Sequence, residues 1–478
     1  MRLAPPFLQP ERLMQGVPSW MIAAMPEPAV TNRETTHPLA PLSFRRVLRT
    51  WWPLAASWFL MGLEGPAISA IVARLANPEI NLAAYGSLIL PLAFFVEAPI
   101  IMLLTASNAL SRDWASYRKI RAFMHGLSGA LTLLHVLIAF TPLYDVFAKV
   151  VFHAPAETIE PGRIGLMIMV PWTWAIAYRR FNQGVLIRFG HSLTVGVGTL
   201  IRLSADGLVL SIGFLLGSVP GTIVAAAATV AGVVAEAVYA GIRVRPVLRT
   251  QLRTADPLPE PLSMRAFLGF YIPLSLTSLI FLIARPIASG SLGRMPAALD
   301  SLAAWPVVTG LVFLFRGFGI AYNEVVVALV HERGSVRTLR RFALLLAGLT
   351  TACLVIVAAP PISGFWFHQV SGLSSSLAAL CQASIWLALL LPALSVLQSW
   401  SQGVILNSRR TRSLTEAVIL FFVVDVGLLV LGVAWGGATG IYVGLAALTL
   451  GELSRNAWLR WRSREARQAL VVRDALGT

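Results

Sequence analysis

The tetrapeptide Leu82-Ala83-Ala84-Tyr85 recurs 220 residues later as Leu302-Ala303-Ala304-Trp305. Other short matches keep a spacing of 219 or 220 residues. They pair Pro53-Leu54 with Pro273-Leu274, Pro142 with Pro361, Gln183-Gly184-Val185 with Gln402-Gly403-Val404, and Asp206 with Asp425. Because one register holds over most of the chain, the sequence indicates two related halves, an arrangement that is frequent in secondary transporters.

The composition places both halves in a membrane. Of the 478 residues 56% are hydrophobic and only 13% are charged, with a mean hydropathy of +0.73, whereas about a quarter of the residues of a soluble domain are charged. Apolar runs of about 20 residues, the length that crosses a bilayer, recur throughout. We expect an all-α polytopic membrane protein with twelve transmembrane helices in two pseudo-symmetric six-helix lobes. The expected spans are 50–74, 82–107, 121–143, 164–187, 193–216, 221–243, 266–290, 301–329, 339–361, 376–406, 414–434 and 438–460.

Arginines mark alternate loops. They cluster before span 1 and after every even-numbered span, and they are scarce in the other loops. By the positive-inside rule, we expect both termini on the cytoplasmic side of a plasma (inner) membrane. This topology explains the formal charge of +16 without a nucleic-acid partner. The expected organisation is a disordered cytoplasmic extension (1–42), a first lobe (43–243), a cytoplasmic linker (244–264), a second lobe (265–462) and a cytoplasmic tail (463–478).

Four charges lie deep inside expected spans. Glu64 belongs to Leu63-Glu64-Gly65-Pro66 on span 1, and Glu97 lies at the middle of span 2. Arg285 and Arg316 occupy the corresponding spans 7 and 8 of the second half. An ionised side chain at the centre of a bilayer costs roughly 2.5–3.5 kcal/mol on insertion scales, so such residues usually face a water-filled cavity or one another. The first half therefore presents carboxylates where the second half presents guanidinium groups.

This asymmetry favours an anionic substrate. A guanidinium group matches a carboxylate or phosphate, so we expect Arg285 and Arg316 to bind the substrate. Asn323 shares a helical face with Arg316. In the absence of substrate, we expect Glu64 and Glu97 to pair with the two arginines across the cleft between the lobes.

Asp206 and Asp425 occupy equivalent positions midway along spans 5 and 11. Membrane carboxylates serve as proton or sodium sites, so one interpretation makes these residues the ion-coupling pair. The other interpretation makes each aspartate the cap of a helix that is broken near Gly207 or Gly427.

Further charges lie nearer the ends of the spans. Snorkelling or interfacial pairing is cheap there, so we expect Glu236 and Glu452 to be structural. Arg179, Arg180 and Arg202 either line the inner vestibule or reach the membrane interface, and we favour the interface.

A set of short motifs resembles a known superfamily. The motifs are Gly62-Leu63-Glu64, Ala84-Tyr85-Gly86, Gly184, Arg285-Pro286-Ile287, Pro306-Val307, Gly437-Ala438-Thr439 and Gly451-Glu452. With the two-times-six architecture, they resemble the multidrug/oligosaccharidyl-lipid/polysaccharide exporters, to which the MATE transporters belong, and most closely the progressive ankylosis (ANK) family. That resemblance implies an exporter of organic or phosphorylated anions such as pyrophosphate, citrate or nucleotide.

Other functions compete with this one. A MATE-type antiporter for cationic drugs is one alternative, although arginines in the cleft oppose it, and a flippase for lipid-linked sugars is the other. An enzyme is not supported, because the sequence has neither a phosphate-binding loop nor a metal-ligand cluster. We expect no cofactor and no catalytic or metal site. The expected partners are a small-molecule anion, H+ or Na+ as the coupling ion, and the bilayer, around a monomeric chain.

Overall fold

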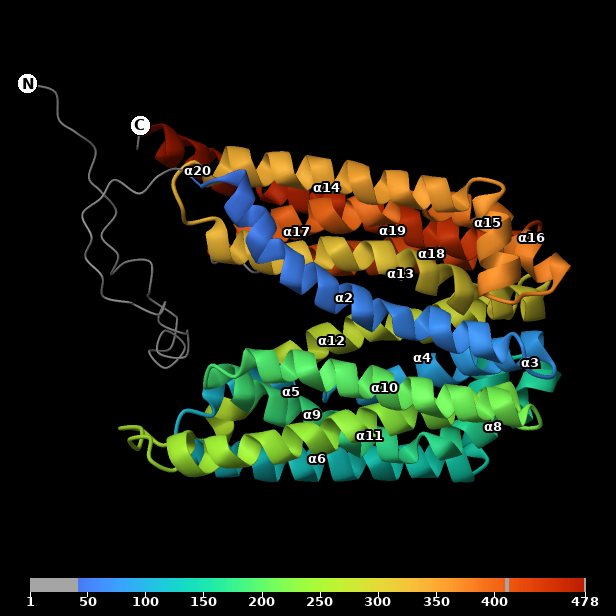
Figure 1. Cartoon of the computed structure of the whole chain (residues 1–478), viewed down its shortest axis with the longest axis horizontal. Coiled ribbons are helices and arrows are strands. Elements are labelled where there is room, and N and C mark those ends of the chain that lie inside the picture. The colour runs from blue at the N-terminus through green and yellow to red at the C-terminus, as the bar shows by residue number, and fades with distance from the viewer. Residues whose placement is uncertain (1–41, 409–411, 477–478) are drawn as a thin grey trace, which may run out of the picture.

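A computed structural model describes residues 42–408 and 412–476, so the predicted N-terminal extension lies outside the described residues apart from Leu42. The described chain is helical, and its long helices run side by side in two stacked lobes (Figure 1). Both ends of the described chain lie at one end of the molecule.

The first lobe contains the helices of the first half. They are α2 (Phe44–Val72), α3 (Pro78–Ala83), η2 (Ala84–Ile89), α4 (Leu90–Glu97), α5 (Leu103–Leu110), α6 (Trp114–Phe140), α7 (Leu143–Val146), η3 (Phe147–Val151), α8 (Ala156–Ile168), α9 (Val170–Arg188), α10 (Ser192–Leu216) and α11 (Gly221–Val247). A short helix, η4 (Leu248–Leu252), leads toward the second lobe.

The second lobe repeats this order. Its helices are α12 (Met264–Leu292), α13 (Ala298–Leu329), α14 (Ser335–Ala358), α15 (Ile362–Gly364), η5 (Phe365–Val370), α16 (Ser375–Ser384), η6 (Ile385–Ala388), α17 (Leu391–Asn407), α18 (Arg412–Trp435) and α19 (Gly440–Arg462). One further helix, α20 (Arg464–Leu476), follows. Each of the twelve expected spans falls on one of these helices or on a run of consecutive helices.

Hydropathy and length alone identify ten candidate membrane spans in the described part of the chain. The helices α9 and α19 are not among them. Both carry charges at their centres, Arg179 and Arg180 on α9 and Glu452 and Arg455 on α19, which lowers their mean hydropathy. These two helices supply the polar networks described below.

The backbone repeats the internal symmetry that the sequence shows only in fragments. Asn77 and Ala297 precede equivalent helices, and both adopt the left-handed conformation, with φ of 52° and 53°. Gly217 caps the C-terminus of α10, and Gly436 directly follows the equivalent helix α18. Both also adopt the left-handed conformation, with φ of 63° and 62°. Left-handed conformations are uncommon for residues other than glycine, so their recurrence at the same spacing supports a duplicated fold.

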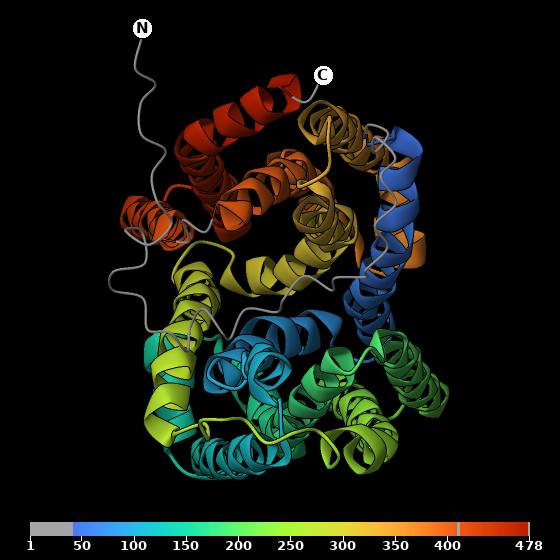
Figure 2. The ribbon, with the colours of Figure 1, turned by 90° about the vertical axis from the view of Figure 1, so that its left-hand side faces the viewer.

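Two helices join the lobes. The first helix, α2, packs along α13 of the second lobe and also contacts α10 of its own lobe, while α12 contacts α18 and α4. Viewed from the end that carries the termini, α2 and α12 lie at the two opposite edges of the molecule, one at each end of the boundary between the lobes (Figure 2). The lobes also approach closely between η2 and α13, where a Cβ atom added to Gly86 would lie 2.4 Å from the ring of Pro306.

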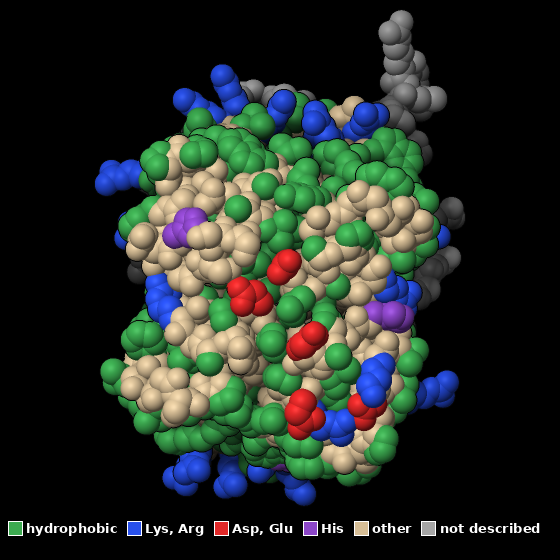
Figure 3. Space-filling view, turned by 90° about the vertical axis from the view of Figure 1, so that its right-hand side faces the viewer, with side chains coloured by type: hydrophobic (Ala, Val, Ile, Leu, Met, Phe, Trp, Pro, Cys, Tyr) green, Lys and Arg blue, Asp and Glu red, His purple; other side chains and the backbone are tan. Residues whose placement is uncertain are grey.

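The lobes also contact each other at the end opposite the termini. Arg74 donates a hydrogen bond to the carbonyl oxygen of Gln369, and Ser374 Oγ donates one of 2.8 Å to Glu79. Arg294 Nε lies 3.0 Å from His153 Nδ1 of the first lobe. Acidic side chains are visible along the middle of this face (Figure 3). These contacts hold the two lobes together on this side.

The equivalent helices differ in one respect. The chain leaves helical geometry between α4 and α5, at Pro99, whereas α13 is continuous. The freed carbonyl oxygen of Pro99 accepts hydrogen bonds from Tyr271 and, at 3.4 Å, from Ser275 of α12. A backbone group freed inside a membrane needs such a partner, so this break is coupled to the second lobe.

Candidate substrate and ion site

The first lobe contains a buried ion-pair network beside α2. Arg202 on α10 donates a hydrogen bond to Glu64 on α2, and the two side chains are 16% and 14% exposed. Arg202 Nε also lies 3.9 Å from Asp206 Oδ2, one helical turn further along α10. One guanidinium group therefore serves two carboxylates, and the prediction that Arg202 reaches the membrane interface is wrong.

Asp206 is the least satisfied member of this network. It is 3% exposed, and neither of its carboxylate oxygens has a hydrogen-bond partner within the described residues. The absence of a side chain at Gly232 on α11 makes room for it, since a Cβ atom there would lie 1.7 Å from Asp206 Oδ1. The helix α10 runs unbroken through Gly207, and α18 runs unbroken through Gly427. The prediction that the aspartates cap broken helices is therefore wrong.

A second ion pair lies deeper in the same lobe. Arg179 on α9 donates to Glu236 on α11, and Gln183 Nε2 donates a 2.8 Å hydrogen bond to the other carboxylate oxygen. Both charged side chains are almost completely buried. Arg179 therefore does not reach the membrane interface, because the carboxylate of Glu236 holds it inside the lobe.

The second lobe has a corresponding network around Glu452. Arg316 Nη2 lies 2.5 Å from Glu452 Oε1, and Arg316 Nε donates a 3.0 Å hydrogen bond to Ser395 Oγ. Arg455 lies 3.6 Å from the other oxygen of Glu452. With its amide oriented to satisfy its neighbours, Gln398 donates to Glu452 and accepts from Arg455. One carboxylate therefore holds two arginines.

The networks of the two lobes share some equivalent positions, although Arg316 and Glu452 correspond to Glu97 and Val233, which form no ion pair among the described residues of the first lobe. At the repeat spacing of 219 residues, Arg179 corresponds to Gln398, Gln183 to Gln402, Asp206 to Asp425, Gly232 to Gly451 and Glu236 to Arg455. Asp425 is buried like Asp206, and a Cβ atom on Gly451 would lie 3.2 Å from its Cβ atom. The positions stay polar while the charges differ. Applying the repeat spacing to every polar residue of spans 4, 6, 10 and 12 would have added the pairs Arg179 and Gln398, Gln183 and Gln402, and Glu236 and Arg455 to the aspartates already matched.

Arg285 differs from Arg179, Arg202 and Arg316, each of which has a carboxylate beside it. Its side chain is exposed, its guanidinium carbon lies 4.7 Å from the ring centroid of Phe94 in the first lobe, and its charge acts on Arg316. Among the described side chains no carboxylate pairs with it. Arg285 therefore brings an uncompensated positive charge to the boundary between the lobes.

Glu97 lies inside the first lobe. It is 0% exposed, and its carboxylate oxygens lack a hydrogen-bond partner in the described chain. The polar groups that act on it, Thr173, Arg179 and Arg180, all belong to α9. It therefore faces its own lobe.

The predicted pairing across the cleft is not present in this structure. Glu64 pairs with Arg202 and Arg316 with Glu452, each within its own lobe. Acidic and basic partners on neighbouring helices of one lobe satisfy these charges first. Asn323 also turns toward its own lobe, where its amide lies 3.5 Å from the Ser399 carbonyl and 3.4 Å from Gln402 Oε1.

No protein-family model matches the sequence, and no curated protein is detectably similar to it. Solved structures do match. An inward-facing multidrug resistance MATE family transporter of the MOP superfamily is 16% identical, with a TM-score of 0.63, over 86% of this chain and 95% of that chain. An outward-facing structure is also 16% identical, with a TM-score of 0.58, over 89% of this chain and 96% of that one.

A third structure is that of a MOP superfamily transporter from Pyrococcus furiosus, described as having a binding pocket of reverse polarity that suggests a different function. It is 17% identical, with a TM-score of 0.58, over 88% of this chain and 96% of that chain. Identities this low establish the fold alone. The chain has the all-helical, two-lobed membrane fold of the MATE transporters.

Proposed function

We propose that this protein is a secondary-active exporter of small anionic metabolites that works by alternating access between its two lobes. The observation that carries the proposal is the state of Arg285. The arginines of the two networks have carboxylates beside them, whereas Arg285 lies exposed at the boundary without one among the described side chains. A charge that is expensive to keep in a membrane is explained by a ligand that neutralises it.

Arg316 completes the anion site. Its charge is shared with Glu452 but still acts on Arg285, so a substrate between the two guanidinium groups would relieve their repulsion. Phosphate and carboxylate groups suit such a pair, since each accepts two parallel N–H donors. Pyrophosphate, citrate and nucleotide are therefore the candidate substrates, as the resemblance to the ANK family implies.

Asp206 is the candidate ion-coupling residue in the first lobe. Its oxygens have no hydrogen-bond donor in the described chain, and it shares the charge of Arg202 with Glu64. Binding H+ or Na+ at this carboxylate would change how strongly Arg202 holds α2, which packs against the second lobe. That is a route from ion binding to lobe movement. Asp425 is the equivalent candidate in the second lobe.

The contacts between the lobes support an orientation for this state. Outside α2 and the linker 244–264, hydrogen bonds of Arg74, Ser374 and Arg294 join the lobes at the end opposite the termini, which positive-inside topology places outside the cell. At the other end it is α2 that contacts the second lobe, where Arg46 pairs with Glu332 and Trp51 donates a hydrogen bond to the carbonyl oxygen of Phe318. We therefore assign the structure to a state that is closed to the outside. Export would require these hydrogen bonds to break while the lobes close around the cytoplasmic end.

The proposal can be tested with the full-length protein in liposomes loaded with citrate, pyrophosphate or ATP. We expect counterflow of at least one labelled anion, a loss of more than tenfold in Arg285→Gln, and a smaller loss in Arg285→Lys, which keeps the charge but not the fork. Leu276→Gln, an exposed position on the same helix, is the control.

The alternative antiporter function predicts the opposite pattern. Ethidium transport that survives Arg285→Gln, with no anion counterflow, would refute the anion proposal and favour a MATE-type drug antiporter. The observation behind this alternative is the acidic pair Glu64 and Asp206 beside α2. A flippase would be favoured if the protein moved a lipid-linked sugar between leaflets but transported neither the anions nor ethidium.

A further inference from the structure

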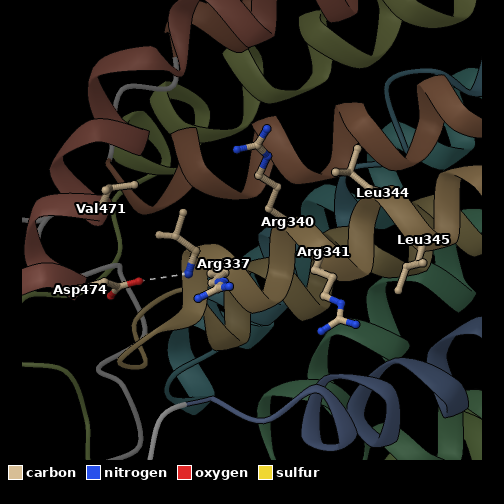
Figure 4. Close-up of a pocket in the computed structure, with 8 residues that line it drawn as sticks. Arg337, Arg340, Arg341, Leu344, Leu345, Val471 and Asp474 are labelled. Atoms are coloured by element: carbon tan, nitrogen blue, oxygen red, sulfur yellow. Dashed lines mark hydrogen bonds between the residues drawn. The ribbon is translucent and has the colours of Figure 1, made fainter. Parts of the chain in front are cut away.

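A basic pocket lies outside the proposed transport site, at the end of the molecule that carries the termini. It has a volume of about 480 Å³ and is formed by the first turns of α14 and by α20 (Figure 4). Its lining residues are Val336, Arg337, Arg340, Arg341, Leu344, Leu345, Val471 and Asp474. None of the residues proposed for transport lines it.

Three arginines give the pocket its charge. Arg337, Arg340 and Arg341 are exposed, and none of them forms an ion pair or a side-chain hydrogen bond within the described residues. Their charges are crowded further by α20, where Arg467 is close enough to Arg340 to be repelled. The carboxylate among the lining residues, Asp474, is held by Arg473 and by the backbone N–H of Val336, so the positive charge of the three arginines stays unpaired within the described residues.

The wall made by α20 is fixed in place. Arg473 Nη1 and Nη2 donate 3.0 Å hydrogen bonds to the carbonyl oxygens of Val330 and Glu332. Asp474 Oδ2 accepts a 3.2 Å hydrogen bond from the backbone N–H of Val336 at the start of α14. Leu470 is buried in the same apolar cluster as the core of α14. The pocket is therefore preorganised and needs no folding of the tail to form.

An apolar surface continues from the arginines along α14. Leu344, Leu345 and Leu349 follow at helical spacing and are each more than half exposed. Basic side chains at the first turns and leucines deeper along one helix face match the order of headgroup and acyl chain in a membrane leaflet. A small soluble anion would leave the leucine surface uncovered.

We propose that this pocket binds an anionic phospholipid. The phosphate diester and a headgroup without a compensating positive charge would contact Arg337, Arg340 and Arg341, and an acyl chain would cover Leu344 and Leu345. Guanidinium groups suit phosphate because they donate two parallel hydrogen bonds. The lipid would fasten α20 to α14, so it would stabilise the second lobe from its membrane-facing side.

The test is lipid retention by the purified full-length protein, measured by native mass spectrometry. Phosphatidylglycerol is the anionic probe and phosphatidylcholine the zwitterionic one. We expect the Arg337→Gln, Arg340→Gln, Arg341→Gln variant to lose phosphatidylglycerol affinity by roughly tenfold or more, since each basic residue near a bilayer contributes to anionic-lipid binding. The matched control neutralises Arg243, Arg245 and Arg249, three arginines at the end of α11 and in η4 that do not line the pocket.

Two further experiments distinguish specific lipid binding in the pocket from a general effect of charge and from misfolding of the variant. The triple arginine-to-lysine variant keeps the charge and should retain most of the lipid binding. Millimolar inorganic phosphate should not displace phosphatidylglycerol, because it cannot cover the leucines. An equal loss in the control triple variant, equal retention of phosphatidylcholine, or displacement by phosphate would each overturn the proposal.

Discussion

Replacing Arg202 by methionine tests how much the ion pair between Arg202 and Glu64 stabilises the packing of α2 on the first lobe. The change keeps an unbranched side chain of similar length but removes the positive charge between Glu64 and Asp206. Both carboxylates then lie in the lobe without their cation. We expect the variant to be strongly destabilised, and we expect Glu64→Gln in the same chain to restore part of the loss.

The geometry sets the magnitude. Two unit charges about 4 Å apart interact by about 4 kcal/mol at an effective dielectric constant of about 20, and Arg202 lies 3.9 Å from Asp206. Breaking a buried pair by removing one partner typically costs about 3–5 kcal/mol. For a folding unit the size of one lobe, this corresponds to a fall of roughly 6–20 °C in Tm.

The assay is thermal unfolding of the full-length protein in detergent, followed by intrinsic fluorescence. The matched control is Arg285→Met, which removes a charge without an ion-pair partner among the described side chains and should lower Tm by much less. A Tm for Arg202→Met within 2 °C of the unmodified protein would refute the reasoning. So would a further fall on adding Glu64→Gln.

Two further predictions concern single positions. Gly232→Ala should cost about 1–3 kcal/mol by overpacking, because the new Cβ atom would meet Asp206 at 1.7 Å, and it should lower Tm more than Gly451→Ala, where the nearest atom lies at 3.0 Å. At the N-terminus of α6, burial of Asp113 opposes ionisation, but hydrogen bonds including one from the Leu258 N–H hold its pKa below the usual value. A lowered pKa contributes stability that is lost as pH falls through the folded-state value, so below about pH 4 unmodified protein should lose more Tm than Asp113→Asn. An equal acid response of both proteins would contradict this.

The repeat and the apolar runs were sufficient to predict the fold. A bilayer-crossing helix depends on about 20 consecutive apolar residues, which is a local property of the chain. The spacing of 219 or 220 residues then predicted two equivalent lobes, and it recurs in the left-handed residues Asn77 and Ala297. The same spacing did not predict that the first lobe breaks at Pro99 while α13 continues.

The sequence did not predict which side chains form ion pairs with the buried charges. Inspection of the spans found the costly charges Glu64 and Arg316, but their partners, Arg202 and Glu452, lie 138 and 136 positions away along the chain. Position within a span suggests depth but not which way a side chain faces. The sequence therefore predicts a structural role for Glu236 and Glu452 near the ends of their spans, but it does not predict that both are buried.

The sequence by itself determined the membrane class, the order of the helices and the duplication, because each follows from local hydrophobicity and from spacing along the chain. Only the tertiary structure decided which charges neutralise each other. Ion pairing depends on distances of a few ångströms between side chains of different helices, and those distances are set by packing within each lobe. That packing leaves Arg285 at the boundary without a carboxylate among the described side chains.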